Sequence, residues 1–268
     1  MAGPPRIVTL LTDFGLQDYF VAAMKGVMLS LNPELSLIDI SHMIPSHDVV
    51  AAAFTLGQAY SYFPPSTIHL AVVDPGVGTA RKALAASADG HYFVAPDNGI
   101  LTYVLEKAQG VRIHEIAEAH YFRRPISSTF HGRDVFAPVA AWISRNISLQ
   151  QLGPALEKPV RLSLPKLTRV RDTLFQATIL AVDKFGNLIT NLRPEDLPVY
   201  RDRPSGSCKI LLRQREIATF RKTYAEGKEG ELFVVPGSAG YLEIVVRNGS
   251  AAALLEAGSG AIIGVILS

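Results

Sequence analysis

Five short polar segments of this chain combine glycine with side chains that could hold or react with a small molecule. Each segment follows or interrupts an apolar, strand-like run. Glycine lets a backbone come close to a ligand, and the neighbouring carboxylates, cations and imidazole supply acid–base groups. The five segments are Thr12-Asp13-Phe14-Gly15, Asp74–Arg81, Ala95-Pro96-Asp97-Asn98-Gly99, Ser128–Asp134 and Asp183-Lys184-Phe185-Gly186-Asn187. Together they predict a small-molecule site built at the ends of strands.

Two of these segments carry groups suited to proton transfer. Asp74 and Arg81 flank a Gly-Val-Gly turn, and a loop of this length can fold back and pair them. A loop-closing salt bridge is the simpler interpretation of this pair, and an exposed one would stabilise the fold by only about 0–1 kcal/mol. His131 lies just before an expected helix, where an ordinary helix-entry histidine and a functional one are about equally favoured.

Two local motif matches point to other functions and are set aside. Asp13-Phe14-Gly15 matches the magnesium-binding tripeptide of protein kinases, but the kinase glycine loop, strand lysine and catalytic loop should all precede it. Gly76-Val77-Gly78 is similar to a dinucleotide-binding loop, but Arg81 stands in place of the third glycine. The seven histidines of the chain show no metal-ligand spacing, so no metal site is expected.

The composition is that of a folded globular protein. Of its 268 residues, 48% are hydrophobic and 19% are charged, with a net charge of +2. The basic residues are scattered, which argues against nucleic acid as a partner. No apolar run reaches membrane-spanning length, and the first residues lack a secretory-signal pattern, so we expect no membrane association and a cytoplasmic location. The single Cys208 excludes an internal disulfide and is best explained as a small packing residue.

The first part of the chain alternates strand-like and helix-like runs. This alternation predicts an α/β layered domain with a largely parallel sheet. Ligands of such sheets bind beyond the carboxyl ends of the strands, where Asp13 and Asp74 would lie. Strands are expected at 7–11, 36–40, 67–73, 83–86 and 92–95, and helices at 19–31, 48–62, 101–107 and 136–145.

The later part of the chain has a different character. Short strand-like runs are separated by turn residues at close intervals, which is typical of a small all-β, barrel-like domain. These runs are 175–182, 209–212, 231–235, 241–246 and 262–267. We therefore expect an N-terminal domain at 1–160, a linker at 161–173 and a smaller C-terminal domain at 174–268.

Taken together and in this order, the motifs resemble those of the adenosine-forming S-adenosyl-L-methionine (SAM) hydrolases, also called SAM hydroxide adenosyltransferases. This family is related to the adenosyl fluorinases and chlorinases. The resemblance covers nearly the whole chain and rests on TDFG at 12–15, VVDPGVGTAR at 72–81, APDNG at 95–99, STFHGRD at 128–134, DKFGN at 183–187 and SAGYLEI at 238–244. It implies an enzyme that displaces methionine from the 5′ carbon of SAM with a water-derived oxygen, without a metal or other cofactor.

The resemblance also implies roles for individual residues and an assembly. Asp74, Arg81 and His131 would hold and activate the water, and Asp13 would bind the ribose hydroxyls. The other implied binding residues are Asp18, Asp183 and Ser238 near the methionine head group, and Phe130, Phe185, Asn187 and Tyr224 around the adenosyl part. In the halogenating relatives an arginine follows the equivalent of Ser238. This chain has Ala239 at that position, so the sequence does not identify the residue that binds the methionine carboxylate. The family assembles as a homotrimer with its active site between subunits.

Two other functions are weighed against hydrolysis. An adenosyl halogenase needs a small dry halide pocket, and those relatives have a tyrosine, a threonine and a serine where this chain has Asp74, Val77 and Gly132. A carboxylate at position 74 would repel a halide, which disfavours this alternative. A non-catalytic SAM or adenosine sensor would keep the binding residues and lose the catalytic ones, all of which are present here.

Overall fold

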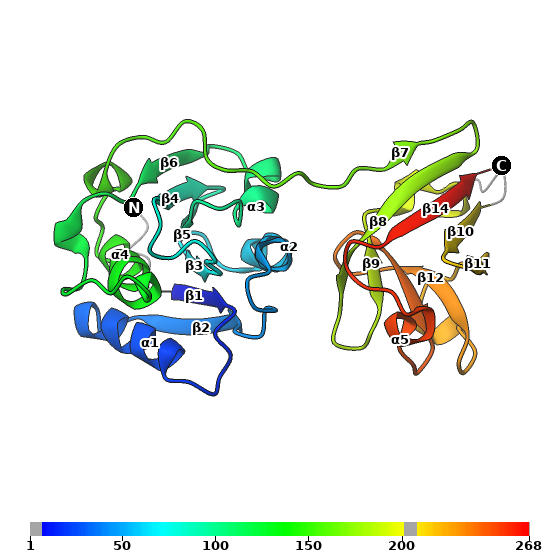
Figure 1. The fold of residues 1–268 in the computed structure, drawn as a ribbon, viewed down its shortest axis with the longest axis horizontal. Helices are drawn as coiled ribbons and strands as arrows, with labels where there is room; N and C mark the ends of the chain where they lie inside the picture. Colours follow the sequence, from blue (N-terminus) through cyan, green and yellow to red (C-terminus); the bar gives the residue numbers. More distant parts are fainter. Residues whose placement is uncertain (1–6, 201–207, 268) are drawn as a thin grey trace. The chain divides into compact units, whose positions relative to one another are not determined.

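The structure is a computed structural model that describes residues 7–200 and 208–267. The chain divides into two compact units, with the division between Leu162 and Ser163 (Figure 1). Each unit has its own sheet and its own hydrophobic core.

The N-terminal unit is built on a six-stranded sheet with the order β2-β1-β3-β5-β4-β6. The neighbours from β2 to β5 are all parallel, and β4 is antiparallel to both β5 and β6, so the sheet is largely parallel as predicted. Its strands are β1 (Ile7–Thr12), β2 (Ser36–Ser41), β3 (Ile68–Val72), β4 (Ala83–Ala88), β5 (His91–Pro96) and β6 (Arg112–Glu115).

Helices cover both faces of this sheet, which produces the expected α/β layers. Successive residues of a strand point to opposite faces, so Leu10 and Leu70 pack in one core while Leu11 and Ala71 pack in the other. The first core is shared with α1 and α4, and the second with α2 and α3. The helices are α1 (Phe20–Leu31), α2 (Val49–Ala59), α3 (Thr102–Lys107) and α4 (Ala137–Ile143).

Two of the expected helices differ from the structure in detail. The helix expected at 48–62 is α-helical only to Ala59 and ends in a 3-10 turn, Tyr60–Tyr62. The helix expected at 136–145 starts earlier, because a π-helical turn over Gly132–Phe136 leads into α4. Strand β6 was not predicted, since its sequence Arg-Ile-His-Glu is polar and it lies at the edge of the sheet.

The C-terminal unit is an antiparallel sheet that nearly closes into a barrel, as predicted. Its strand order is β11-β10-β14-β8-β9-β13-β12, with β7 paired to β8. An isolated bridge from Phe220, just after β11, to Val234 of β12 brings the two ends of the sheet together. The strands are β7 (Thr168–Arg169), β8 (Leu174–Val182), β9 (Leu188–Thr190), β10 (Cys208–Leu212), β11 (Arg215–Ile217), β12 (Leu232–Pro236), β13 (Leu242–Val246) and β14 (Ile262–Leu267), with one short helix, α5 (Ala251–Leu255).

Within the described ranges, no helix combines the length and the apolar character needed to cross a membrane.

Candidate functional site

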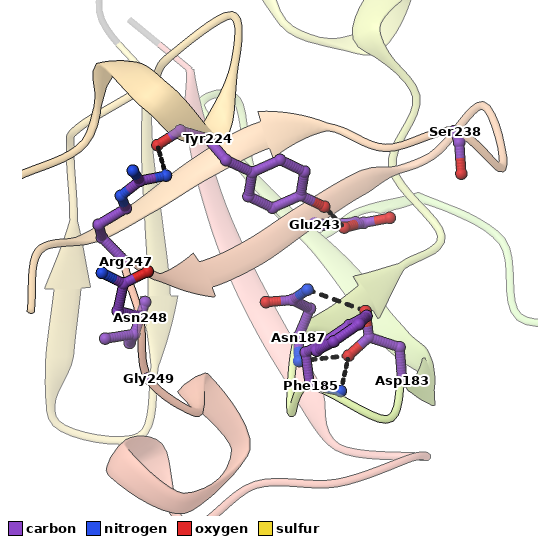
Figure 2. A pocket seen from close by; sticks show the side chains of 10 residues that line it. Asp183, Phe185, Asn187, Tyr224, Ser238, Glu243, Arg247, Asn248 and Gly249 are labelled. Atoms are coloured by element: carbon purple, nitrogen blue, oxygen red, sulfur yellow. Dashed lines mark hydrogen bonds between the residues drawn. The ribbon is translucent and has the colours of Figure 1, made fainter.

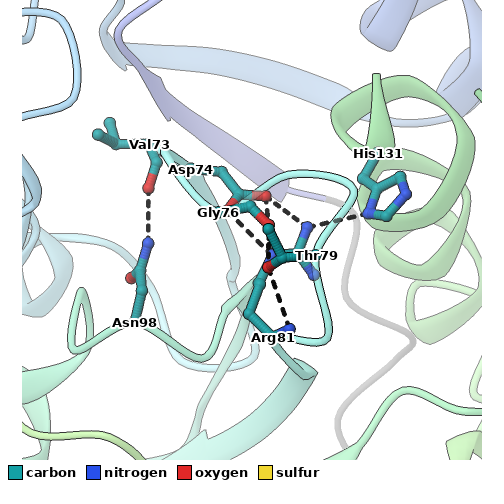
Figure 3. A network of polar contacts seen from close by, with 7 residues as sticks. All are labelled: Val73, Asp74, Gly76, Thr79, Arg81, Asn98 and His131. Carbon is teal, nitrogen blue, oxygen red and sulfur yellow. Dashed lines mark hydrogen bonds and ion pairs between the residues drawn. The ribbon is translucent and has the colours of Figure 1, made fainter. Parts of the chain in front are cut away.

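Two carboxylates of the N-terminal unit follow neighbouring parallel strands. Asp13 comes directly after β1, and Asp74 comes two residues after the end of β3. Since β1 and β3 are paired in parallel, their carboxyl ends lie at the same edge of the sheet. The side chain of Asn98 donates a hydrogen bond to the carbonyl oxygen of Val73 over 2.8 Å, which fixes the backbone just before Asp74 (Figure 3).

A cavity of about 280 Å³ opens at this edge. Asp13, Asp74, Phe130 and His131 line it, and so do apolar and small residues that include Phe14, Phe20, Val77 and Gly132. Phe130 is held in place by edge-to-face contacts with Phe14 and Phe20, with ring centroids 6.0 Å and 5.1 Å apart. The structure thus gathers four of the predicted site residues around one small cavity with an apolar wall.

Asp74 and Arg81 form a buried ion pair. The Arg81 Nε donates to both carboxylate oxygens, over 2.9 Å to Oδ1 and 3.0 Å to Oδ2, and its Nη2 also donates to Oδ2 (Figure 3). Only 5% of the Asp74 side chain and 11% of the Arg81 side chain are exposed. A fork of this kind fixes the orientation of a carboxylate far better than a single contact does.

Arg81 also joins Asp74 to His131. Its Nη2 lies 3.0 Å from the Nδ1 of His131. A guanidinium can only donate, so Nδ1 accepts and the neutral ring carries its proton on Nε2, the nitrogen on the far side of the ring from Arg81 (Figure 3). Burial and then the charge of Arg81 lower the pKa of His131 below its usual 6.5. Asp74, Arg81 and His131 therefore form one hydrogen-bonded network with the arginine in the middle.

The close approach of two loops makes this network possible. Gly78, in the loop between Asp74 and Arg81, has a positive φ of 76°, and a Cβ at this position would lie 2.5 Å from the carbonyl oxygen of Ser128. Only glycine fits both conditions. The loop can then pack against the segment that carries His131 at the start of the π-helical turn. Such π-helical turns are frequent at functional sites.

The one carboxylate of the Ser128–Asp134 segment does not belong to this network. Asp134 is fully buried and accepts hydrogen bonds from Arg133, Arg123 and the backbone N–H of Ser127. Its pKa is lowered, because these bonds outweigh the effect of burial, which acts in the opposite direction. These bonds hold the segment in shape, and Asp134 does not line the cavity.

Asp13 keeps part of its carboxylate free for a ligand. One oxygen, Oδ2, accepts the backbone N–H of His47 over 2.9 Å, and the side chain lines the cavity. The backbone of Gly15 donates to the carbonyl oxygen of His42, which closes the loop that carries Asp13. Asp18 lies farther along this loop, is exposed and is not part of the cavity wall.

The remaining predicted residues lie together in the C-terminal unit. Asp183, Phe185, Asn187, Tyr224 and Ser238 all line a cavity of about 660 Å³ (Figure 2). Phe185 is 76% exposed, an unusual position for a large aromatic side chain and one suited to stacking on a flat ligand. Ser238 is exposed at the rim, and Ala239 next to it brings no charge.

The hairpin loop between β8 and β9 is held by its own aspartate. Asp183 Oδ1 accepts the backbone N–H groups of Phe185 and Asn187 over 2.8 Å and 2.9 Å, and Oδ2 accepts the Asn187 side chain over 2.8 Å. These bonds present Phe185 and Asn187 on the cavity wall. Both oxygens of Asp183 are thus engaged within the loop. Its expected contact with the methionine head group stays a prediction.

Sequence reasoning missed Glu243 of β13. This glutamate lines the same cavity, is 5% exposed and accepts a hydrogen bond from the hydroxyl of Tyr224 (Figure 2). Burial, followed by the hydrogen bond to Glu243, raises the pKa of the Tyr224 hydroxyl. A signal was present in the sequence, because Glu243 is a lone charge inside the apolar run from Tyr241 to Val246.

The described residues contain no group of three or more His, Cys, Asp or Glu side chains that could hold a metal ion.

Comparisons with known proteins agree on one family. Residues 8–153 match the family model described as the SAM hydroxide adenosyltransferase N-terminal domain, and residues 177–264 match the corresponding C-terminal domain. The chain is 39% identical to the (R)-S-adenosyl-L-methionine hydrolase of Salinispora tropica, over 94% of each chain. It is 37% identical to the protein of the same name from Methanocaldococcus jannaschii, over 93% of this chain and 92% of the relative.

A more distant relative and a solved structure are also similar to this chain over most of its length. The fluorinase of Actinoplanes sp. is 28% identical over 90% of this chain and 91% of its own. A crystal structure of an uncharacterized conserved protein from Thermotoga maritima superposes with a TM-score of 0.88 at 38% identity, covering 97% of this chain and 99% of that one. The two domain matches and the long, closely similar relatives show that this chain belongs to the SAM hydroxide adenosyltransferase family.

Proposed function

We propose that this protein hydrolyses SAM to adenosine and L-methionine. The observation that carries the proposal is the Asp74–Arg81–His131 network at the wall of the 280 Å³ cavity. The relatives named as SAM hydrolases, which cover nearly the whole chain, support the choice of substrate.

The chemistry requires help for the nucleophile and little for the leaving group. A sulfonium leaves as a neutral thioether and needs no proton, whereas water is a weak nucleophile whose pKa lies far above neutral pH. The protein must therefore hold one water in line with the C5′–S bond and ease the loss of its proton. Correct positioning contributes roughly 7–11 kcal/mol in well-oriented intramolecular reactions.

We assign one part of this task to each member of the network. Asp74 lines the cavity and accepts a hydrogen bond, and then the proton, from the water. Arg81 fixes the carboxylate through its fork of N–H groups and supplies positive charge next to the developing hydroxide. His131 is neutral and has an N–H on Nε2, which completes the hydrogen-bonding environment as a donor.

The remaining predicted residues are assigned to substrate binding. Asp13 binds the ribose hydroxyls, and Phe130 forms an apolar wall beside them. In the C-terminal unit, Phe185 and Tyr224 flank the adenine and Asn187 hydrogen-bonds to the adenosyl part. We keep Asp18, Asp183 and Ser238 as proposed partners of the methionine head group. A halide site is disfavoured because a carboxylate, Asp74, lines the smaller cavity.

The test is a product assay with the purified full chain. SAM should yield adenosine and methionine in equal amounts, with an unchanged rate in excess chelator. The two sulfonium epimers should be assayed separately, because the relatives are named for the (R) epimer. Methylthioadenosine and homoserine lactone as products, or tight binding with no product, would show that the proposed reaction is wrong.

The protonation state of His131 predicts the acid limb of the pH profile. Burial and Arg81 lower the pKa of His131 below 6.5, so the ring stays neutral at pH 6.5 and gains a proton only in more acid solution. Protonation removes the acceptor of Arg81 and places two cations side by side. We therefore expect kcat/KM to be retained through pH 6.5 and to fall below it.

The variant His131→Asn tests the assignment of this acid limb to the histidine. Its remaining activity should lack the acid limb of the wild-type profile, since asparagine does not gain a proton in this range. An acid limb that stays in place in this variant would assign it to another group. A rate that rises as the pH falls would mean that protonated His131 is the active form.

Replacing Asp13 with asparagine should weaken SAM binding with little change in kcat. Asparagine keeps an oxygen that can accept the backbone N–H of His47, so the loop should hold its shape. The ribose hydroxyls lose a charged acceptor, and hydrogen bonds to charged groups contribute about 1.5–3 kcal/mol. We expect a rise in KM of about 10- to 100-fold, measured by steady-state kinetics, with the exposed Asp172→Asn variant as control. A drop in kcat with an unchanged KM would show that Asp13 acts in the chemical step.

We further propose that the active enzyme is a homotrimer whose sites combine residues of two chains. The support is that the proposed groups fall into two sets, with the water-activating residues in one unit and most of the adenosyl-binding residues in the other. The resemblance to the family supplies the sharing between chains. Head-to-tail contacts that close into a ring make three equivalent sites.

Subunit mixing tests this assembly. An Asp74→Asn chain and an Asp183→Ala/Asn187→Ala chain are each expected to be inactive. After subunit exchange, shared sites give partial recovery of activity, because some sites receive two intact halves. Proven exchange without recovery, or a monomer in light scattering, would exclude the proposed sharing.

A further inference from the structure

Glu243 is a buried carboxylate without a cationic partner among the residues that the structure describes. It lies in the middle of β13 and is 5% exposed, yet it belongs to the wall of the C-terminal cavity. Its one hydrogen bond among the described residues comes from the neutral hydroxyl of Tyr224 to Oε2. No ion pair of the described residues includes it. Glutamate is rarely buried to this extent unless it is paired with a cation or another strong partner.

The neighbouring charges make this position more unfavourable for an anion. Burial and then the negative charge of Asp183 raise the pKa of Glu243, although the Tyr224 hydrogen bond acts against them. The nearest cation of the cavity wall, Arg247, donates to the backbone oxygen of Tyr224 and lies at the other end of that side chain (Figure 2). A cationic ligand beside Glu243 would relieve the unfavourable charge.

The location of the carboxylate identifies the part of the cavity that this ligand would occupy. A Cβ on Gly237 would lie 1.9 Å from Oε1 of Glu243, so this oxygen lies against the backbone directly before Ser238. Figure 2 shows the carboxylate extending from the Tyr224 hydroxyl toward the side of the cavity where Ser238 lies. Glu243 thus occupies the Ser238 end of the cavity, away from Arg247 and Asn248.

We propose that Glu243 binds the α-ammonium group of the methionine part of SAM. This inference rests on the proposed function. SAM has two cationic centres, and a carboxylate beside the sulfonium would stabilise the ground state of a group that loses its charge in the reaction. The ammonium keeps its charge throughout, so binding it costs nothing in the transition state. Both oxygens of Asp183 already accept hydrogen bonds within its own loop, whereas Oε1 of Glu243 accepts none among the described residues.

The main experiment compares substrates with and without the amine. SAM and its analogue with hydrogen in place of the α-amino group are titrated calorimetrically into the full chain carrying Asp74→Asn, in which turnover is slow. Adding Glu243→Gln, which keeps the size and an acceptor for Tyr224, should weaken SAM binding about 10- to 100-fold. Binding of the deamino analogue and of adenosine should change less than threefold.

A second variant moves the carboxylate without removing it. In Gly237→Ala the new methyl group would lie 1.9 Å from Oε1, 2.4 Å from Cδ and 2.8 Å from Cγ of Glu243, so the Glu243 side chain must move out of its present position. This variant should reproduce the selective loss of SAM affinity even if Glu243→Gln fails to fold. Glu195→Gln, at an exposed position outside the cavity, is the matched control and should bind SAM like the parent.

Four outcomes would overturn the proposal. They are unchanged SAM affinity in both variants, an equal loss for SAM and the deamino analogue, an equal loss for adenosine, and a loss in Tyr224→Phe as large and as selective as in Glu243→Gln. The last would mean that Glu243 acts only by holding Tyr224. The proposed function is tested separately. If SAM bound through its amine and the wild-type chain never hydrolysed it, the proposed hydrolysis would be wrong, and the role of Glu243 in binding would still be supported.

Discussion

Asp74→Asn should reduce kcat for adenosine release about 10²- to 10⁴-fold, the usual contribution of a positioned acid–base group. Asparagine has the same shape and keeps one oxygen for the Arg81 fork, but its amide cannot take a proton from water. The affinity for SAM should change by less than threefold, because Asp74 is assigned to the water and not to the substrate. Single-turnover kinetics and calorimetric titration measure the two effects separately.

The control for this variant is another aspartate with a surface ion pair. Asp172 is exposed and pairs with Arg169, so Asp172→Asn should leave both kcat and affinity unchanged. If Asp74→Asn kept a near-normal kcat, Asp74 would be neither the proton acceptor nor the group that orients the water. If it lost affinity and kcat together, the carboxylate would be part of the substrate site.

Arg81→Met should abolish activity and also destabilise the fold. The substitution leaves the Asp74 carboxylate, 5% exposed, without its cation and removes the donor to His131. Breaking a buried pair in this way costs about 3–5 kcal/mol in the free energy of unfolding. Denaturant titration of the variant should show this loss, and SAM turnover should fall at least as far as in Asp74→Asn.

Arg81→Lys separates the positive charge from the geometry. Lysine keeps the charge but cannot donate in a fork to Asp74 and also reach Nδ1 of His131. We expect most of the stability to return while kcat stays about 10²-fold below wild type. The double variant Asp74→Asn/Arg81→Lys should be little worse than either single one, since the residues act as a unit. Full recovery of kcat in Arg81→Lys would reduce the role of Arg81 to that of a counter-charge.

The layers of the N-terminal unit could be predicted because their signals are local. Buried parallel strands such as β3 appear as continuous apolar runs, and helices such as α1 appear as apolar residues at the helical period. The elements that the sequence did not predict also have local causes. Strand β6 is short, polar and completed by its pairing with β4, and the π-helical turn before α4 has no sequence signature that distinguishes it from an ordinary helix start.

Residue types and their order were enough to identify the chemical groups and the strand ends that carry them. Asp13 and Asp74 were predictable at one edge of the sheet because parallel strands place their carboxyl ends together. The motif set also indicated the family, which the comparisons confirmed. These conclusions needed only the residue types, their order along the chain, and the spacing of apolar residues that distinguishes helices from strands.

The tertiary structure decided what each charged group does, because charge interactions depend on distances in space and on burial. Asp74 and Asp134 both stand next to arginines in glycine-containing loops, yet only Asp74 lines the cavity, while Asp134 is turned inward to hold its loop. The contact between Arg81 and His131 joins residues 50 positions apart and sets the tautomer of the histidine. Glu243 looked like one charge in an apolar strand until the fold buried it at a cavity wall with no ion-pair partner among the described residues, where the energy of an unpaired carboxylate is high enough to favour a cationic ligand.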